Sequence, residues 1–281
     1  MPHDVPQRNN VRISGSGEQP MLFAHGFGCD QNMWRFVTPA FEDRYQLVLF
    51  DYVGSGKSDL WAYDPQRYGS LDGYAQDVLD ICEALDLHDV IFVGHSVSSV
   101  IGVLAANRAP ERFARLIMVG PSASYINDPP DYVGGFERPD IEGLLEMMDK
   151  NYLGWASFLA PAVMKNPENG ELTAELEQSF CATDPKIARR FAQVTFLSDN
   201  RSDFVKLQVP SLIMQCSDDS IAPLSAGEFL AREIPHTTFR LMQATGHCPH
   251  MSAPQETIEI IKDYLADADV CSQVPDPAAA V

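Results

Sequence analysis

The fold of this chain is decided by the stretch Val90-Ile91-Phe92-Val93-Gly94-His95-Ser96-Val97-Ser98-Ser99. Apolar and β-branched residues up to Gly94 predict a buried strand, and the residues after Ser96 predict a helix that runs through Arg108. A serine on so sharp a strand-to-helix turn has its hydroxyl pushed out of the sheet, with helix amides close behind it. This is the geometry of a nucleophile elbow, whose usual pattern is G-x-S-x-G. Ser98 takes the place of the last glycine, where a small residue is needed because helix and strand lie close together.

Strand and helix patterns alternate on both sides of this stretch. Strands are expected at residues 21–24, 46–50, 115–119, 209–215 and 238–242. Helices are expected at residues 30–41, 71–87, 225–234 and 254–265. Such an alternation is typical of parallel strands joined by right-handed crossovers. The sequence therefore predicts an α/β fold with a mostly parallel central sheet flanked by helices.

The alternation stops in the middle of the chain, where only helical patterns occur. These cover residues 141–152, 155–164, 172–181 and 187–197, with proline and glycine turn signals between them. A helical insertion at this point lies over the carboxyl ends of the strands and is interpreted as a four-helix lid. The predicted domains are a core of residues 1–124 and 204–267 and a lid of residues 125–203. Residues 268–281, rich in Ala, Asp and Pro, are expected to form a disordered tail.

Composition and charge argue against several classes of protein. A formal net charge of −19 disfavours binding to nucleic acid and to anionic membrane surfaces. No apolar run approaches the ~18 residues of a membrane-spanning helix, and the polar N-terminus is unlike a secretory signal. The cysteines lie far apart and lack the paired spacing of a zinc site. We therefore expect a cytoplasmic protein with reduced thiols, no metal and no cofactor.

A second glycine-rich segment, Gly54-Ser55-Gly56-Lys57-Ser58, is similar to a phosphate-binding loop. That motif requires a glycine five positions before its Gly-Lys pair, and Asp51 occupies this position. We therefore reject nucleotide binding and interpret the segment as a tight bend after the strand at residues 46–50.

The late strands deliver candidates for an acid and a base to the same edge of the sheet. Asp218 and Asp219 follow the strand at residues 209–215, and the spacing to Pro223 favours Asp219 over Asp218. His247 comes directly after a glycine that follows the strand at residues 238–242. This placement favours His247 over His250 as the base.

Serine, aspartate and histidine at the ends of successive strands appear in the chain order of a hydrolytic triad. We assign Ser96 as the nucleophile, His247 as the general base and then acid, and Asp219 as the residue that orients the imidazole. A free hydroxyl is a poor nucleophile near neutral pH without an adjacent base. Dehalogenase and carboxylate-nucleophile epoxide hydrolase chemistry are disfavoured because they need aspartate at position 96.

The oxyanion that forms during such a reaction needs amide donors. The strand at residues 21–24 leads into His25-Gly26-Phe27-Gly28, and an H-G-x-G segment of this kind supplies one donor on the residue after the first glycine. We therefore expect the backbone amides of Phe27 and Val97 to form the oxyanion hole. His25 is interpreted as a structural residue that shapes the loop.

Taken together, the motifs resemble those of the RsbQ-like α/β-hydrolases, which act upstream of a bacterial general-stress sigma factor. They are also similar to those of the plant karrikin and strigolactone receptor hydrolases, whose elbow agrees with Ser98. The resemblance extends over nearly the whole chain and is carried by residues 23–31, 49–56, 71–77, 94–97 and 246–252, with lid segments at 125–128, 134–137 and 150–152. It implies the α/β-hydrolase fold with a four-helix lid over a small, enclosed, hydrophobic pocket.

The resemblance also implies a function: slow hydrolysis of a small hydrophobic ester or lactone, coupled to signalling. The implied pocket residues are Phe27, Phe136, Trp155, Phe196 and Ile221. In the bacterial branch the implied partner is a phosphatase that carries a PAS sensor domain. Two alternatives stay open at this point. One is a signalling protein that acts by partner binding with incidental hydrolysis, and the other is the same triad acting in carbon–carbon hydrolysis or perhydrolysis.

Overall fold

A seven-stranded sheet forms the centre of the computed structural model, which describes residues 4–272 and the side chains of residues 4–267. The strand order is β1-β3-β2-β4-β5-β6-β7, and every neighbouring pair is parallel except β1 with β3. The strands are β1 (Arg12–Ser14), β2 (Pro20–Ala24), β3 (Gln46–Leu49), β4 (Val90–His95), β5 (Phe113–Val119), β6 (Ser211–Asp218) and β7 (Thr237–Thr245). The predicted α/β fold with a mostly parallel sheet is confirmed.

Helices cover both faces of this sheet. Outside the middle segment they are α1 (Val5–Arg8), α2 (Leu71–Ala84), α3 (Val97–Arg108), α8 (Arg201–Phe204), α9 (Leu224–Glu233), α10 (Pro249–Ser252) and α11 (Pro254–Ser272). Side chains of α2, α3 and α9 share one hydrophobic cluster, and side chains of α11 belong to another on the opposite face. None of the helices within residues 4–272 is long and apolar enough to cross a membrane.

The elbow strand β4 shows why the sheet needs cover on both faces. Val90 and Phe92 pack into the cluster of α2 and α3, whereas Ile91 and Val93 pack into the cluster of α11. Successive side chains of a strand point to opposite faces, so a strand buried on both sides is a continuous apolar run. The same run in the sequence therefore places β4 in the interior of the sheet, between β2 and β5.

The prediction of one helix over residues 30–41 is wrong. The segment forms two short 3₁₀ helices, η1 (Gln31–Trp34) and η2 (Thr38–Ala40). Pro39 has no amide hydrogen and its ring clashes with the carbonyl four residues earlier, so an α-helix does not continue through it. Trp34 is still fully buried against the sheet, which explains the apolar pattern.

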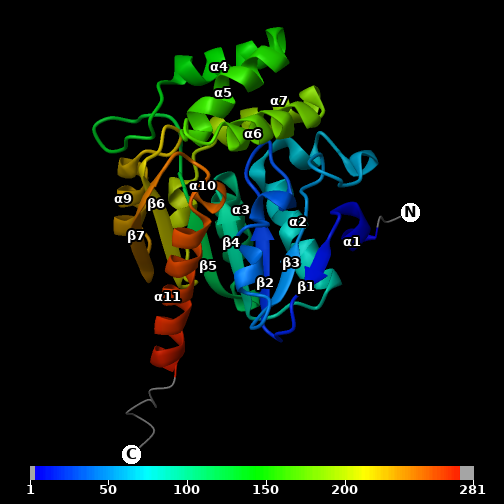
Figure 1. Cartoon of the computed structure of the whole chain (residues 1–281), viewed down its shortest axis with the longest axis vertical. Coiled ribbons are helices and arrows are strands. Elements are labelled where there is room, and N and C mark those ends of the chain that lie inside the picture. Colours follow the sequence, from blue (N-terminus) through cyan, green and yellow to red (C-terminus); the bar gives the residue numbers. More distant parts are fainter. Residues whose placement is uncertain (1–3, 273–281) are drawn as a thin grey trace, which may run out of the picture.

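Four helices occupy residues 138–196, between β5 and β6, and Figure 1 shows them stacked above one end of the sheet. They are α4 (Arg138–Lys150), α5 (Tyr152–Met164), α6 (Gly170–Ala182) and α7 (Pro185–Phe196). Their buried side chains form a cluster of their own, which also includes loop residues of the core such as Cys29 and Cys248. We propose that residues 125–203 are the lid and that residues 1–124 and 204–267 are the core.

The C-terminal segment differs from the expected tail. Helix α11 does not end near residue 265 but continues through Ser272, so residues 268–272 are helical. No proline or glycine interrupts the chain between Pro254 and this point. Residues 273–281 lie outside the described range.

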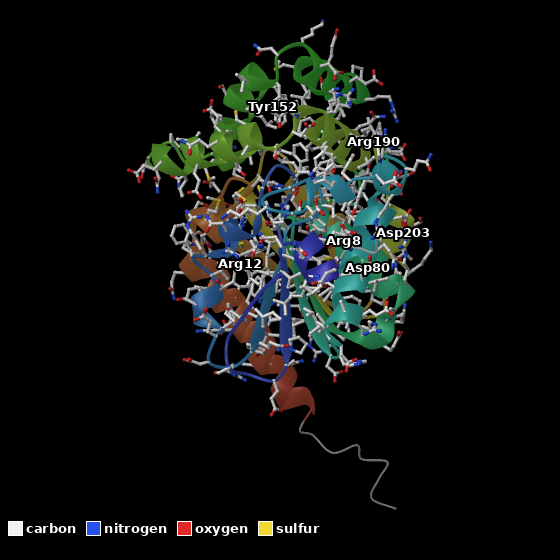
Figure 2. The ribbon with its side chains drawn as sticks, turned by 90° about the vertical axis from the view of Figure 1, so that its right-hand side faces the viewer. Arg8, Arg12, Asp80, Tyr152, Arg190 and Asp203 are labelled. Carbon is white, nitrogen blue, oxygen red and sulfur yellow. The ribbon has the colours of Figure 1, made fainter. Side chains whose placement is uncertain are left out.

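A cluster of charges holds the N-terminal helix α1 on α2. Arg8 donates to Asp77 at 3.2 Å and to Asp80 at 2.9 Å, and Figure 2 shows Arg8 and Asp80 side by side. Arg67 donates to the same two carboxylates at 2.7 and 2.8 Å. The Asp77 side chain is fully buried and also accepts from the Tyr68 hydroxyl at 3.0 Å. Two guanidinium groups balance two carboxylates, so the cluster joins the N-terminal segment to the core.

Candidate active site

Ser96 lies at the turn between β4 and α3. Its φ of 56° and ψ of −121° are values that L-residues rarely adopt, and such strain persists only where the surrounding structure enforces it. A side chain at Gly94 would place its Cβ 2.7 Å from the Ser98 carbonyl oxygen, so helix and strand can approach only because this residue is glycine. The Ser96 amide donates to the Val119 carbonyl of β5 at 2.8 Å. Helix packing and the neighbouring strand therefore both hold the serine in this turn.

The three side chains of the predicted triad lie in one hydrogen-bonded line. His247 Nε2 is 2.7 Å from Ser96 Oγ, and His247 Nδ1 is 2.7 Å from Asp219 Oδ2. A carboxylate can only accept, so we assign the ring proton to Nδ1, which leaves a lone pair on Nε2 facing the serine. The second carboxylate oxygen accepts from the amides of Ile221 at 2.8 Å and Ala222 at 3.0 Å. This arrangement orients the imidazole to take a proton from the Ser96 hydroxyl.

The two alternative candidates are placed differently. The Asp218 carboxylate points to the surface, is 60 % exposed and pairs with Lys165 Nζ at 2.6 Å. Consecutive residues at the end of a strand point in opposite directions, which separates Asp218 from Asp219. His250 is buried between the rings of Trp34 and His95, at centroid distances of 4.5 and 4.4 Å. Burial lowers the pKa of His250 to about 3, so its ring stays neutral.

Backbone contacts hold His247 in place. Its amide donates to the Val163 carbonyl near the end of α5 at 2.8 Å. Its carbonyl accepts from His95 Nε2 at 2.7 Å. The preceding Gly246 has a φ of 81°, and a Cβ there would lie 2.1 Å from the Met164 carbonyl oxygen. The Gly-His pair is thus required where the lid helix α5 meets the loop of the base.

The two expected oxyanion donors lie on neighbouring strand ends. In the register of β2 with β4, Ala24 faces Gly94, so the loop that contains Phe27 emerges beside the elbow. Among the described residues, the Phe27 amide donates to no acceptor. The Val97 amide belongs to the first residue of α3, where helix amides have no partner within the helix. Both amides are therefore free to donate to a substrate.

A cavity lies directly over Ser96 and His247. Its volume is about 30 Å³, and apart from the triad its walls are almost entirely apolar. The lining residues are Phe27, Cys29, His95, Ser96, Leu159, Val163, Leu176, Phe180, Phe196, Ile221, His247 and Cys248. A larger and more open hollow of about 500 Å³ beside Arg8 and Arg67 is lined by no residue of the triad. The partly enclosed cavity at Ser96 is thus placed to bring a substrate to the serine.

Two of the predicted pocket residues lie outside this lining. Trp155 packs behind Phe27, with ring centroids 6.0 Å apart, and Phe136 is half-buried at the edge of the same cluster. Phe27, Phe196 and Ile221 do line the cavity. The predicted pocket did not include the wall that α5 and α6 provide, namely Leu159, Val163, Leu176 and Phe180. Their spacing of four residues on each helix is the signal that could have identified them.

Tyr125 is a further group near the nucleophile. Its hydroxyl is 3.4 Å from Ser96 Oγ, and its ring packs on Phe196 with centroids 5.0 Å apart. Burial raises the pKa of this hydroxyl, so it keeps its proton. Tyr125 follows the end of β5, next to the elbow strand, and this position in the sequence indicates that it lies near Ser96.

Comparison with known proteins identifies the family. Residues 19–254 match the family described as alpha/beta hydrolase fold. The chain belongs to the α/β-hydrolase family. Esterases and an enol-lactonase occur among its relatives, and this α/β-hydrolase is a carboxylic ester hydrolase.

Individual relatives of this α/β-hydrolase match it over almost its full length. The karrikin insensitive 2 receptor CA of Petunia hybrida is 37% identical over 93% of this chain and 97% of its own. A strigolactone esterase of Arabidopsis thaliana is 34% identical over 94% of this chain and 98% of its own. A solved hydrolase from Oleispira antarctica is 48% identical and has a TM-score of 0.92. The match covers 94% of this chain and 96% of the Oleispira chain. The predicted resemblance to the plant receptor hydrolases is confirmed, and RsbQ-like proteins fit the related bacterial branch.

Proposed function

We propose that this α/β-hydrolase cleaves a carboxylic ester or lactone of a small hydrophobic compound through Ser96, His247 and Asp219. The observation that carries the proposal is the unbroken line of 2.7 Å hydrogen bonds from Ser96 through His247 to Asp219. This line ends at the floor of an apolar cavity.

Acylation begins when Ser96 Oγ attacks the carbonyl carbon and its proton passes to His247 Nε2. The carbonyl oxygen becomes an oxyanion, which the amides of Phe27 and Val97 stabilise by donation. Asp219 stabilises the imidazolium. When the tetrahedral intermediate collapses, the bond to the alcohol oxygen breaks and the leaving oxygen takes the proton from His247.

Deacylation repeats these steps with water as the nucleophile. His247 removes a proton from water, the hydroxide attacks the acyl carbon, and collapse returns the proton to Ser96 Oγ as the acid leaves. With an ester, an alcohol and an acid are released separately. With a lactone, the leaving oxygen stays attached to the acyl group, so the product is a single hydroxy acid.

The small apolar cavity limits the acyl group that can be accepted. We expect kcat/KM for p-nitrophenyl octanoate to be at least about tenfold below that for the butyrate, because extra methylenes forced into a packed site cost about 1–3 kcal/mol. Leu159→Ala removes a wall residue of the cavity and should shift the preference towards longer chains. Leu153→Ala on the same helix is the matched control, since Leu153 is 64% exposed. Equal rates for both esters in the unmodified protein would contradict this assignment of the cavity.

A signalling role is the second part of the proposal. Its support is that several relatives are named as karrikin receptors rather than only as esterases. In this role hydrolysis is slow and signals the presence of the small molecule to a partner protein. The predicted partner is a PAS-domain phosphatase in the cytoplasm. A turnover number below about 1 s⁻¹, the lower end of typical enzymes, together with capture of such a phosphatase, would support the role. Fast turnover without capture would favour a plain esterase.

A further inference from the structure

The fifth residue of the elbow, where the usual pattern has glycine, carries a hydroxyl with a specific partner. Ser98 is fully buried in the first turn of α3. Its Oγ donates to the carbonyl oxygen of His25 at 2.5 Å. His25 directly follows β2 and begins the loop that contains Phe27, so the bond joins the helix behind the nucleophile to the loop that supplies the other oxyanion donor.

Tyr52 supports this bond from the far side. Its hydroxyl is 2.9 Å from Ser98 Oγ. A serine hydroxyl has one proton, and Ser98 already donates it to a carbonyl, so Tyr52 is the donor and Ser98 the acceptor. Burial raises the pKa of Tyr52, which keeps the phenol protonated. A buried chain of donors therefore runs from Tyr52 through Ser98 to His25.

The His25 residue is held through its ring as well. Nδ1 donates to the Gly26 carbonyl at 2.8 Å, and Nε2 accepts from the Tyr52 amide at 3.2 Å. Burial lowers the pKa of His25, which suits the neutral ring that this pattern requires. The backbone at Gly26 packs directly against His95, because a Cβ at this position would lie 2.5 Å from His95 Nδ1. The peptide just before the Phe27 amide is thus clamped between two elements.

We propose that Ser98 is a positioning residue that fixes the Phe27 amide where the oxyanion develops, and that Tyr52 acts through Ser98. This inference rests on the proposed hydrolytic function of Ser96. An oxyanion donor stabilises the transition state only if it is held in place before the reaction, and small displacements weaken it strongly. The hydroxyl of Ser98 provides this restraint directly from the helix that carries the nucleophile.

A purely structural role would leave a different signature. In that case the hydroxyl only satisfies a buried carbonyl, and its loss lowers the free energy of unfolding without changing the chemistry of the folded enzyme. Ser211→Ala is the matched control for such a loss. Ser211 is also fully buried, and its Oγ bonds to Thr237 Oγ1 at 2.9 Å. It is the first residue of β6, however, and the triad follows the other ends of the strands.

The test compares Ser98→Ala, Tyr52→Phe, their double variant and Ser211→Ala. Each purified variant is assayed for kcat and KM with p-nitrophenyl butyrate, for inhibition by butylboronic acid, and for the pH dependence of kcat/KM. A boronic acid forms a tetrahedral adduct with a serine hydroxyl and places a negative oxygen in the oxyanion hole. It therefore reports donor placement without turnover.

We expect Ser98→Ala to lower kcat about tenfold and to weaken boronic acid inhibition by the same factor, short of the 10²–10³-fold lost when a donor is removed outright. KM and the acid limb of the pH profile should not change, because the contacts of His247 with Asp219 are untouched. Tyr52→Phe should have a smaller effect, and the double variant should match Ser98→Ala, because Tyr52 acts through Ser98. Ser211→Ala should keep both kcat and inhibition.

Unchanged kcat and inhibition in folded Ser98→Ala would overturn the inference. Equal losses in Ser211→Ala would overturn it as well. If Ser98→Ala does not fold, Tyr52→Phe tests the inference in its place, because this variant keeps the bond from Ser98 to His25. Wild-type kcat and inhibition in Tyr52→Phe would then contradict the role of Tyr52 in this chain of donors and, with it, the inference. Failure of the proposed function looks different, because the unmodified protein would then turn over no ester, or Ser96→Ala would turn it over at the wild-type rate.

Discussion

Ser96→Ala is expected to abolish release of p-nitrophenol from short-chain esters, with kcat lower by an amount on the order of 10⁶-fold. The alanine has no oxygen to attack the carbonyl, and His247 Nε2, 2.7 Å away in the unmodified protein, then has no hydroxyl to deprotonate. Substrate binding should survive, because the apolar walls of the cavity are unchanged. The measurement is steady-state hydrolysis of the butyrate ester by purified protein, with thermal unfolding as the check that the variant folds.

Ser99→Ala is the matched control for this change. Ser99 lies in the same turn of α3, is fully buried, and donates through Oγ to the Gly94 carbonyl at 3.1 Å. Its hydroxyl bonds to neither Ser96 nor His247, and Ser99 is not among the residues that line the cavity, so turnover should stay near that of the unmodified protein. Full activity of Ser96→Ala would overturn the assignment of the nucleophile.

Asp219→Asn is expected to lower kcat about 10⁴-fold while leaving the fold intact. The reason lies in the two oxygens of the carboxylate. The asparagine carbonyl oxygen can keep the bonds from the Ile221 and Ala222 amides, which places the NH₂ group towards His247 Nδ1. A donor at this position forces the ring proton onto Nε2, so the lone pair that should accept the serine proton is lost.

Asp218→Asn tests the same chemical change one residue away. It weakens an exposed ion pair with Lys165, which is worth about 0–1 kcal/mol of stability, and should leave kcat unchanged. The comparison needs the ester assay and urea unfolding of both variants. Loss of activity in Asp218→Asn with retention in Asp219→Asn would reverse the assignment of the acid.

The sheet and the region of the site could be predicted from local patterns. The four residues from Val90 to Val93 are all apolar and the whole of β4 is buried, a pattern that indicates a strand covered on both faces. Parallel strands end at one edge, so residues that follow successive strands must lie near one another. This geometry explains why Ser96, Asp219 and His247 could be predicted as a triad from the sequence.

Other features depended on details that local patterns do not contain. Pro39 is an exception, because it is a local signal for a break that the prediction of one helix over residues 30–41 did not use. The walls of the cavity were predicted only in part, because the rotation of α5 and α6 about their axes decides that Leu159 and Leu176 face inward while Trp155 packs behind Phe27.

The amino-acid sequence by itself determined the class of fold, the order of the triad along the chain and the small residues that its turns require. Only the tertiary structure decided which side chains line the cavity and that the Ser98 hydroxyl reaches His25. The physical reason is the range of the interactions. Periodicity and turn chemistry act over a few neighbouring residues, whereas side-chain direction at the site is set by packing between segments that are distant in the sequence.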